Sequence, residues 1–305
     1  MKIFVTGGNG FLGAALCTTL RALGHEITAP SSKECDLTDA QSLTAFSAEK
    51  YDQIFHLAAW TQAGDFCLYH PGEQWIINQK LNTHVLEWWQ KEQPQAKLVF
   101  MGTSCAYAPD LALSEPLYMQ GEPIDSLYTY AMTKRMLFQG ARALQKQYRL
   151  QWLCFVPSTL YGPGYHTDGR QMHFVFDLIR KIIRAKEYGE TVFLWGNGYQ
   201  KREIVHVQDF INAMLAVSEN STNDIFNVGS GEEFTIRHFA ETICQIVGYD
   251  SSLIEYDAAR YVGATSKCLS IEKISKLIPD YKQNQVSIES GLRSTIDWFY
   301  SVKAY

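Results

Sequence analysis

The first thirty residues combine a short apolar strand, a glycine-rich turn and an amphipathic helix. The strand is KIFVT, residues 2–6, and the turn after it contains Gly7, Gly10 and Gly13. The next segment, FLGAALCTTLRAL, repeats leucines at helical spacing, and HEITA begins another strand. A tight glycine turn lets the backbone approach a pyrophosphate, whose charge the helix N-terminus stabilises. The stretch therefore predicts a dinucleotide-binding unit, with an ordinary glycine-rich turn as the alternative.

The same alternation continues through the first half of the chain. The apolar runs QIFHLAA, KLVFM and QWLCFVP predict further strands, and the segments between them predict helices at about 39–49, 74–92 and 128–148. Strands that alternate with helices are typical of a parallel sheet covered on both faces. The sequence thus predicts an α/β fold with a Rossmann-type, doubly wound parallel sheet.

Length and composition limit the partners and the compartment. The chain of 305 residues is long enough for two domains, and we expect a dinucleotide-binding domain over 1–160, to which segments near 200–230 return, and a mainly substrate-binding, smaller α/β domain over 161–305. The net charge of −5 disfavours nucleic acid, and no run of 18 apolar residues predicts a membrane span. Four glycines interrupt the N-terminal apolar run, which argues against a signal peptide. The seven cysteines are scattered without CxxC spacing, so we expect reduced thiols in a cytoplasmic protein and no metal site.

The segment YTYAMTKRMLFQGARAL reads as a helix that carries a tyrosine and a lysine on one face. Tyr130 and Lys134 are four residues apart, so their side chains are neighbours on that helix. An ammonium beside a phenol favours the phenolate and is expected to lower the pKa of the tyrosine. Such a tyrosine can protonate a carbonyl oxygen or accept a proton from an alcohol.

A thiol stands close to the end of another predicted strand. The loop GTSCAYAP follows KLVFM, and ligands of open α/β sheets lie beyond the carboxyl ends of the strands. We therefore expect Thr103, Ser104 and Cys105 to face the ligand. The alternative for Cys105 is simple packing, because free cysteines usually behave as small hydrophobic residues.

The edge of the second strand bears on the choice of dinucleotide. This strand continues as EITAPSSK, with no carboxylate at its tip to bind a ribose 2′-hydroxyl. That pattern favours the 2′-phosphate of NADPH, bound by Ser31, Ser32 or Lys33, although NAD is possible. Asp36 could accept a hydrogen bond from the adenine amine, and a local helix cap is the alternative.

Together these motifs resemble the extended short-chain dehydrogenase/reductases. The resemblance runs from TGGNGFLG through HLAAW, GTSCAYAP, YAMTK, PSTLYGPG and REIVHVQDF to FNVGSGEEFTI, almost the whole chain. It implies a hydroxyl–Tyr–Lys triad of Thr103, Tyr130 and Lys134, with Ser104 as the competing hydroxyl. It also implies that the dinucleotide lies along residues Gly7, Gly10, Phe11, Leu12, Gly13, Ser31, Ser32, Lys33, Asp36, Leu37, Leu57, Ala58, Ala59, Tyr130, Lys134 and Pro157.

Within that family, GDP-L-fucose synthases place a cysteine two residues past the hydroxyl, where Cys105 stands here. Their partner histidine lies downstream of LYGP and maps to His173, with His166 as the fallback. A 4-keto sugar has acidic hydrogens at C3 and C5, and inversion there requires proton removal and return on opposite faces. A thiol and an imidazole can both titrate near neutrality. The resemblance therefore implies an NADPH-dependent 3,5-epimerase/4-reductase of a GDP-4-keto-6-deoxy sugar.

The resemblance also suggests how the nucleotide sugar is held. It maps the arginine that meets the diphosphate to Arg202 and the lysine near the nucleotide to Lys267. Trp195 is expected to wall the sugar or base pocket, or else to belong to the core. The expected sugar-contacting residues have changed at Thr159, Val262 and Ser270. We therefore expect a GDP-linked sugar whose exact structure, such as a 6-deoxyhexose or a heptose, stays open.

Three other functions fit parts of this pattern. They are an NAD-dependent nucleotide-sugar 4-epimerase, a C4-reductase or C3-epimerase of another 4-keto-deoxy sugar or heptose, and, more remotely, a non-catalytic dinucleotide sensor. The predicted helices near 74–92 and 128–148 are apolar on more than one face. Members of the family pair these two helices between subunits, so we expect a homodimer and neither nucleic acid nor a membrane as partner.

Overall fold

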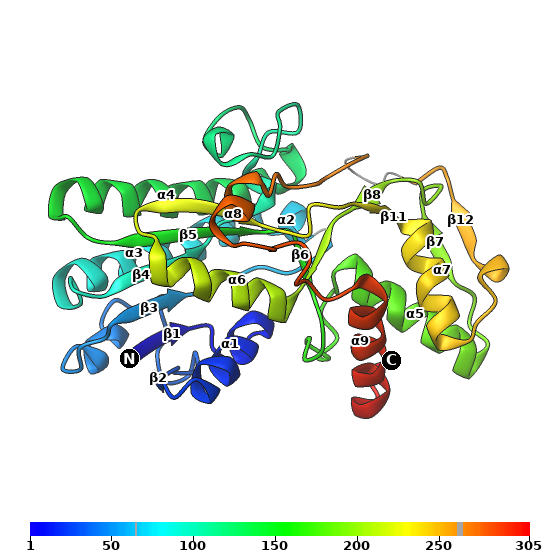
Figure 1. Ribbon diagram of the computed structural model, residues 1–305, viewed down its shortest axis with the longest axis horizontal. Coiled ribbons are helices and arrows are strands. Elements are labelled where there is room, and N and C mark those ends of the chain that lie inside the picture. Colours follow the sequence, from blue (N-terminus) through cyan, green and yellow to red (C-terminus); the bar gives the residue numbers. More distant parts are fainter. Residues whose placement is uncertain (65, 261–264) are drawn as a thin grey trace.

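A computed structural model describes residues 1–64, 66–260 and 265–305. Its centre is a six-stranded parallel sheet with the strand order β10-β5-β4-β3-β1-β2 (Figure 1). The order changes direction at β1, since the chain first adds β2 on one side and then β3 on the other. Ligands of such sheets bind beyond the carboxyl ends at this switch point. The six strands are β1 (Lys2–Thr6), β2 (Glu26–Thr28), β3 (Gln53–His56), β4 (Lys97–Met101), β5 (Trp152–Pro157) and β10 (Asp224–Val228).

Helices cover both faces of the sheet, which confirms the predicted doubly wound α/β fold. One face carries α1 (Phe11–Ala22) and α6 (Val207–Asn220), and the other carries α3 (Pro71–Glu92) and α4 (Tyr128–Tyr148) (Figure 1). Successive strand residues point to opposite faces. A strand buried on both sides must therefore be apolar where it is buried, as β4 is from Leu98 to Met101.

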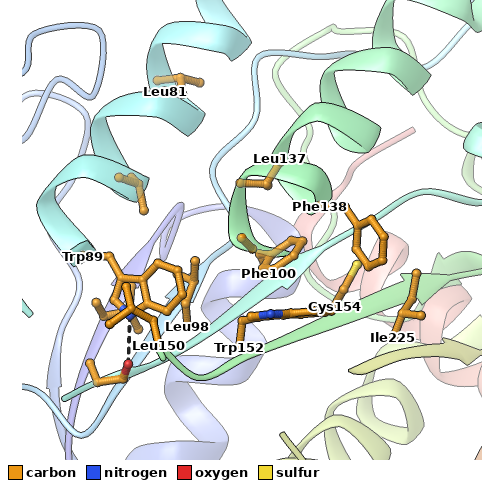
Figure 2. Packing of buried hydrophobic residues seen from close by; sticks show 14 of the residues in the cluster. Leu81, Trp89, Leu98, Phe100, Leu137, Phe138, Leu150, Trp152, Cys154 and Ile225 are labelled. Atoms are coloured by element: carbon orange, nitrogen blue, oxygen red, sulfur yellow. Dashed lines mark hydrogen bonds between the residues drawn. The ribbon is translucent and has the colours of Figure 1, made fainter. Parts of the chain in front are cut away.

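Large side chains fill the layer between the sheet and the helices α3 and α4. Figure 2 shows Trp89 of α3 and Phe138 of α4 packed over Leu98, Phe100 and Trp152 of the sheet. The indole of Trp89 is fully buried and donates a hydrogen bond of 2.9 Å to the carbonyl of Ala96. This layer fixes α4, the helix that carries Tyr130 and Lys134, against the strand that leads to Thr103.

The remaining elements build the part of the molecule on the right of Figure 1, around a separate hydrophobic cluster. Three helices dominate it, and three separate pairs of short strands accompany them. The division of the chain into domains at residue 160 stays a prediction. The helices are α5 (Phe174–Tyr188), α7 (Ile236–Val247) and α9 (Ile288–Val302), and the strand pairs are β6 (Thr159–Tyr161) with β9 (Ile204–His206), β7 (Phe193–Trp195) with β12 (Glu255–Asp257), and β8 (Lys201–Arg202) with β11 (Phe234–Thr235).

The short helices complete the description. They are α2 (Phe66–Tyr69), α8 (Glu272–Leu277) and the 3₁₀ turns η1 (Ser42–Phe46), η2 (Ser104–Ala106), η3 (Glu115–Leu117), η4 (Asp125–Leu127) and η5 (Ser251–Leu253). None of the helices over the described ranges is long and apolar enough to cross a membrane.

The predicted helix at 39–49 is wrong, because only the 3₁₀ turn η1 forms there. Short polar side chains satisfy the backbone locally: Asp39 accepts a hydrogen bond from the amide of Gln41, and the Thr44 hydroxyl donates to the carbonyl of Gln41. Such bonds compete with a continuous helix. Leu43 is the buried anchor of the segment.

Candidate active site

The glycine turn lies between the ends of β1 and β3. Gly7 has a φ of +70°, and a Cβ there would lie 2.8 Å from the amide nitrogen of Ala58. A Cβ on Gly13 would lie 2.1 Å from the carbonyl oxygen of Gly7. Gly10 is the N-cap of α1, and no side chain caps the helix amides there. Backbone thus lines a cradle at a helix N-terminus, which fits the pyrophosphate of a dinucleotide.

Filling this cradle should damage both the fold and cofactor binding. We expect Gly13→Ala to lower the free energy of unfolding by about 1–3 kcal/mol, because the methyl group must displace backbone, and to abolish binding of NADPH. Gly72→Ala is the matched control, because a Cβ at Gly72 has no atom within 4 Å. Denaturant titration and NADPH fluorescence measure the two effects. Equal behaviour of the two variants would contradict this account of the turn.

A buried hydrogen-bonded chain supports the strand ends on either side of this turn. The Thr6 hydroxyl accepts from the amide of Ala58 at 3.2 Å and lies 2.8 Å from His56 Nδ1. His56 Nε2 lies 3.1 Å from Asn82 Oδ1, and the Asn82 amide donates to the carbonyl of Thr133. Burial, aided by the charge of Lys134, lowers the pKa of His56 to about 4. The neutral ring therefore donates to Asn82 and accepts from Thr6. This series of hydrogen bonds holds the predicted cofactor-contacting segment 57–59 in place.

The edge of β2 contains an acidic group that the sequence analysis did not consider. The backbone amide and hydroxyl of Ser31 both donate to the Glu34 carboxylate at 2.8 Å, which lowers the pKa of Glu34. Ser32 and Lys33 are exposed, whereas the side chain of Leu37 is buried in the core. A cofactor could therefore meet Leu37 only through its backbone.

Asp36 forms a local turn at the same edge. One of its carboxylate oxygens accepts hydrogen bonds from both the amide and the hydroxyl of Thr38. The other carboxylate oxygen of Asp36 would accept the predicted hydrogen bond from an adenine amine. The helix cap that was the alternative does not form, since residues 36–39 precede no α-helix in the structure.

The end of β4 meets the first turn of α4. Thr103 is buried, and its hydroxyl accepts a hydrogen bond of 3.2 Å from the amide of Cys105. Burial raises the pKa of Tyr130, the thiols of Cys105 and Cys67 raise it further, and the Thr103 hydroxyl opposes them. The Thr103 hydroxyl therefore contacts the phenol of Tyr130, and the choice between Thr103 and Ser104 as the active-site hydroxyl stays a prediction.

Lys134 lies one turn further along α4. Its ammonium is 6.0 Å from the centre of the Tyr130 ring, and burial lowers the pKa of Lys134 to about 8. The expectation that this lysine lowers the pKa of Tyr130 is wrong for the structure as it stands. Desolvation of the phenolate outweighs the ammonium. The phenol is consequently protonated at neutral pH and is suited to donate a proton.

Lys267 interacts with both Cys105 and His173. The Lys267 ammonium donates a hydrogen bond of 3.3 Å to Cys105 Sγ. Desolvation lowers the pKa of His173, and the positive charges of His166 and Lys267 lower it further. His173 is the N-cap of α5, and part of its surface is exposed to solvent. His166 instead has Nδ1 3.4 Å from the carboxylate of Asp168.

Comparison with known proteins agrees with this geometry. Residues 3–229 match the NAD dependent epimerase/dehydratase family. The chain belongs to that family. It is 27% identical to the GDP-L-colitose synthase of Yersinia pseudotuberculosis over 99% of both chains, and 27% identical to the GDP-L-fucose synthase of Escherichia coli strain K12 over 98% of this chain and 96% of the other. A crystal structure of a GDP-L-fucose synthetase from Naegleria fowleri superimposes with a TM-score of 0.88 at 21% identity, over 98% of this chain and 93% of that one.

Membership of the NAD dependent epimerase/dehydratase family confirms two predictions. The chain is a dinucleotide-dependent enzyme, and its fold is of the Rossmann type. The relatives support a nucleotide-sugar epimerase/reductase as its class. The roles assigned to individual residues stay predictions.

Three of the residues predicted to hold the substrate lie on short strands between β5 and β10. Thr159 begins β6, directly after Pro157 and Ser158, and Arg202 lies half-buried on β8, where Glu233 faces it. Trp195 is 58% exposed on β7, so its alternative role as a core residue is wrong. The guanidinium of Arg260 lies 4.9 Å from the centre of its ring. Val262 lies outside the described residues.

A cavity of about 610 Å³ opens between α2 and the segment 168–171. Phe66, Tyr69 and Arg170 contribute to its lining. The helix α2 also carries Cys67, whose thiol is electrostatically coupled to Cys105 and to Tyr130. The described residues that line the cavity do not include the predicted reaction groups, which α2 approaches through Cys67. No group of three or more His, Cys, Asp or Glu residues in the described part of the chain could hold a metal ion.

Proposed function

We propose that this enzyme is a 3,5-epimerase/4-reductase of a GDP-4-keto-6-deoxy sugar, with NADPH as the reductant. The observation that carries the proposal is the joint placement of Cys105 and His173 around Lys267, close to Tyr130. A 4-epimerase requires the tyrosine and lysine but gives a thiol and an imidazole no task. The names of the fucose and colitose synthases support a GDP-linked sugar.

The proposed reaction consists of a hydride transfer from NADPH and of proton transfers by side chains of the enzyme. NADPH, held at the glycine cradle, would supply a hydride to C4 of the sugar. The neutral phenol of Tyr130 would donate its proton to O4, supported by the Thr103 hydroxyl and the charge of Lys134. Cys105 and His173 would remove and return the protons at C3 and C5 from opposite faces of the ring. Arg202 would bind the diphosphate as a charge-assisted donor, and Trp195 would wall the pocket for the sugar or the base.

One incubation separates this function from its rivals. GDP-4-keto-6-deoxymannose is added to the enzyme in deuterated water, with and without NADPH, and the products are examined by NMR. We expect deuterium at C3 and C5 in both cases and reduction at C4 only with NADPH. Reduction without deuterium would indicate a plain C4-reductase, and the absence of any reaction would overturn the assignment of the sugar.

The choice of dinucleotide gives a separate prediction. The absence of a carboxylate at the tip of β2 favours NADPH, and we expect its kcat/KM to exceed that of NADH by about tenfold or more, since a bound phosphate gains charge-assisted hydrogen bonds. Because Glu34 engages Ser31, Glu34→Gln should increase this preference. Glu87→Gln, an exposed change on α3, is the control. A preference for NADH in the unmodified enzyme would show that the β2 edge has been misread.

We infer that the enzyme is a homodimer that pairs α3 and α4 with a second copy. Trp75 and Ile76 on α3 are 40% and 57% exposed, so apolar surface remains after this helix has packed on the sheet. Sedimentation velocity at micromolar concentration should show a dimer, and Ile76→Glu should weaken it. A monomer alone in the unmodified enzyme would count against this interface.

A further inference from the structure

Lys267 reaches Cys105 from a segment that is fastened at several points. Its own backbone amide donates to the Glu233 carboxylate at 3.1 Å, and the hydroxyl of Ser266 donates to the same oxygen at 2.7 Å. Two residues later, the amide of Leu269 donates to Glu203 at 2.9 Å. The backbone around Lys267 is thus held independently of its ammonium.

The second of these anchors is deeply buried. Glu203 is 3% exposed, and its other oxygen accepts a hydrogen bond of 2.7 Å from the amide of Gly231. Desolvation raises the pKa of Glu203 to about 7, and the backbone amides oppose that shift. The carboxyl group therefore serves the segment 229–231 and the segment after Lys267, and it is not directed at the reaction cluster.

A positive group is in direct contact with the thiol of Cys105. Its neighbours are Cys67 from α2 and Tyr130 from α4, which both carry no charge as thiol and phenol. Lys267 donates to the sulfur, and its charge also reaches His173. An ammonium at hydrogen-bond distance stabilises a thiolate and makes it more reactive.

We propose that Lys267 is a positioning residue for Cys105, whose hydrogen bond to Sγ directs the sulfur at the ring carbon and supports the thiolate that acts as the base there. The inference deepens the proposed function and rests on it for its place in the reaction. In that step the C–H bond breaks, its electron pair passes into the enolate of the 4-keto sugar, and the proton goes to the sulfur. Lys267 stays protonated throughout and becomes free to meet the substrate diphosphate as the thiolate is neutralised.

Alkylation of the enzyme without substrate tests this role directly. Iodoacetamide is added to the full-length protein at pH 7, and modification of the Cys105 peptide is followed by mass spectrometry. We expect Lys267→Met to slow the alkylation of Cys105 by about tenfold or more, as loss of a charge within 4–6 Å predicts. Lys267→Arg should retain a rate within about threefold of the unmodified enzyme, since it keeps the charge.

A second lysine provides the matched control. Lys282→Met removes an exposed ammonium that pairs with Glu232 in the same half of the chain, and it should leave the rate at Cys105 unchanged. Cys105 alkylated in Lys267→Met at the original rate or faster would overturn the proposal. If Lys267→Met does not fold, Lys267→Gln is compared with Lys267→Arg by the same criterion.

The outcome is separable from that of the proposed function. Alkylation needs no sugar, so it reports on the Lys267–Cys105 pair even if GDP-4-keto-6-deoxymannose is not a substrate. With an accepted substrate, Lys267→Met at saturation should lose deuterium incorporation at C3 or C5 more than it loses reduction at C4. Equal losses in both steps would contradict a role through the thiol.

Discussion

Tyr130→Phe should reduce the NADPH-dependent reduction of the 4-keto sugar by about 10²–10⁴-fold, the usual contribution of a general acid. Burial keeps the phenol protonated, and the Thr103 hydroxyl lies against it. The substitution removes the proton donor to O4 but leaves the glycine cradle, so binding of NADPH should change little. Stopped reduction with intact binding, measured by NADPH oxidation and by fluorescence titration, would show that the loss is chemical.

A neighbouring tyrosine makes this result specific. Tyr128 lies two residues earlier on α4 and is 38% exposed. Tyr128→Phe removes the same hydroxyl from the same helix and should leave turnover close to that of the unmodified enzyme. If Tyr130→Phe kept more than a few per cent of turnover, another group would have to protonate O4.

Cys105→Ser should stop deuterium incorporation at the inverted centres while reduction at C4 continues. Serine keeps the size and the place of the side chain but is a far weaker acid than a thiol, so it cannot act as the base. We expect the exchange rate to fall by at least about 10²-fold, the lower range for loss of a general base. NMR of products formed in deuterated water measures exchange and reduction in the same sample, and the product should be the non-epimerised 4-hydroxy sugar.

The second thiol near Tyr130 is the control for this experiment. Cys67 is buried on α2, and Gln74 donates a hydrogen bond of 3.4 Å to its sulfur. Cys67→Ser should retain exchange and epimerisation. Exchange at the original rate in Cys105→Ser would mean that the thiol only packs in its loop, and a plain 4-reductase or 4-epimerase would then be the better assignment.

The features that were predicted correctly depend on short stretches of sequence. The glycine turn follows from Gly7, Gly10 and Gly13, of which Gly7 and Gly13 lie where a Cβ would collide with backbone. The common face of Tyr130 and Lys134 follows from helical spacing alone. The predicted helix at 39–49 failed for the opposite reason, since side-chain bonds to the backbone compete there and periodicity does not reveal them.

The features that were missed depend on contacts between distant segments. Lys267 and Cys105 are 162 residues apart, and only the folded backbone brings them together. The buried chain through His56 and Asn82 links three parts of the sequence, although the histidine stood in a recognised motif. The raised pKa of Tyr130 also required the structure, because a lysine four residues away is visible in the sequence but desolvation is not.

The glycine cradle has a consequence for how such enzymes can change. Its contacts with a pyrophosphate would come from backbone atoms, since a Cβ at Gly7 or Gly13 would collide with backbone. The group that distinguishes one dinucleotide from another would instead meet the edge after β2, where residues 32–34 and 36 are exposed. Affinity for the shared part of the cofactor and discrimination between cofactors are therefore encoded in separate places, one rigid and one free to vary. Cofactor preference could be re-engineered at that edge without disturbing the turn.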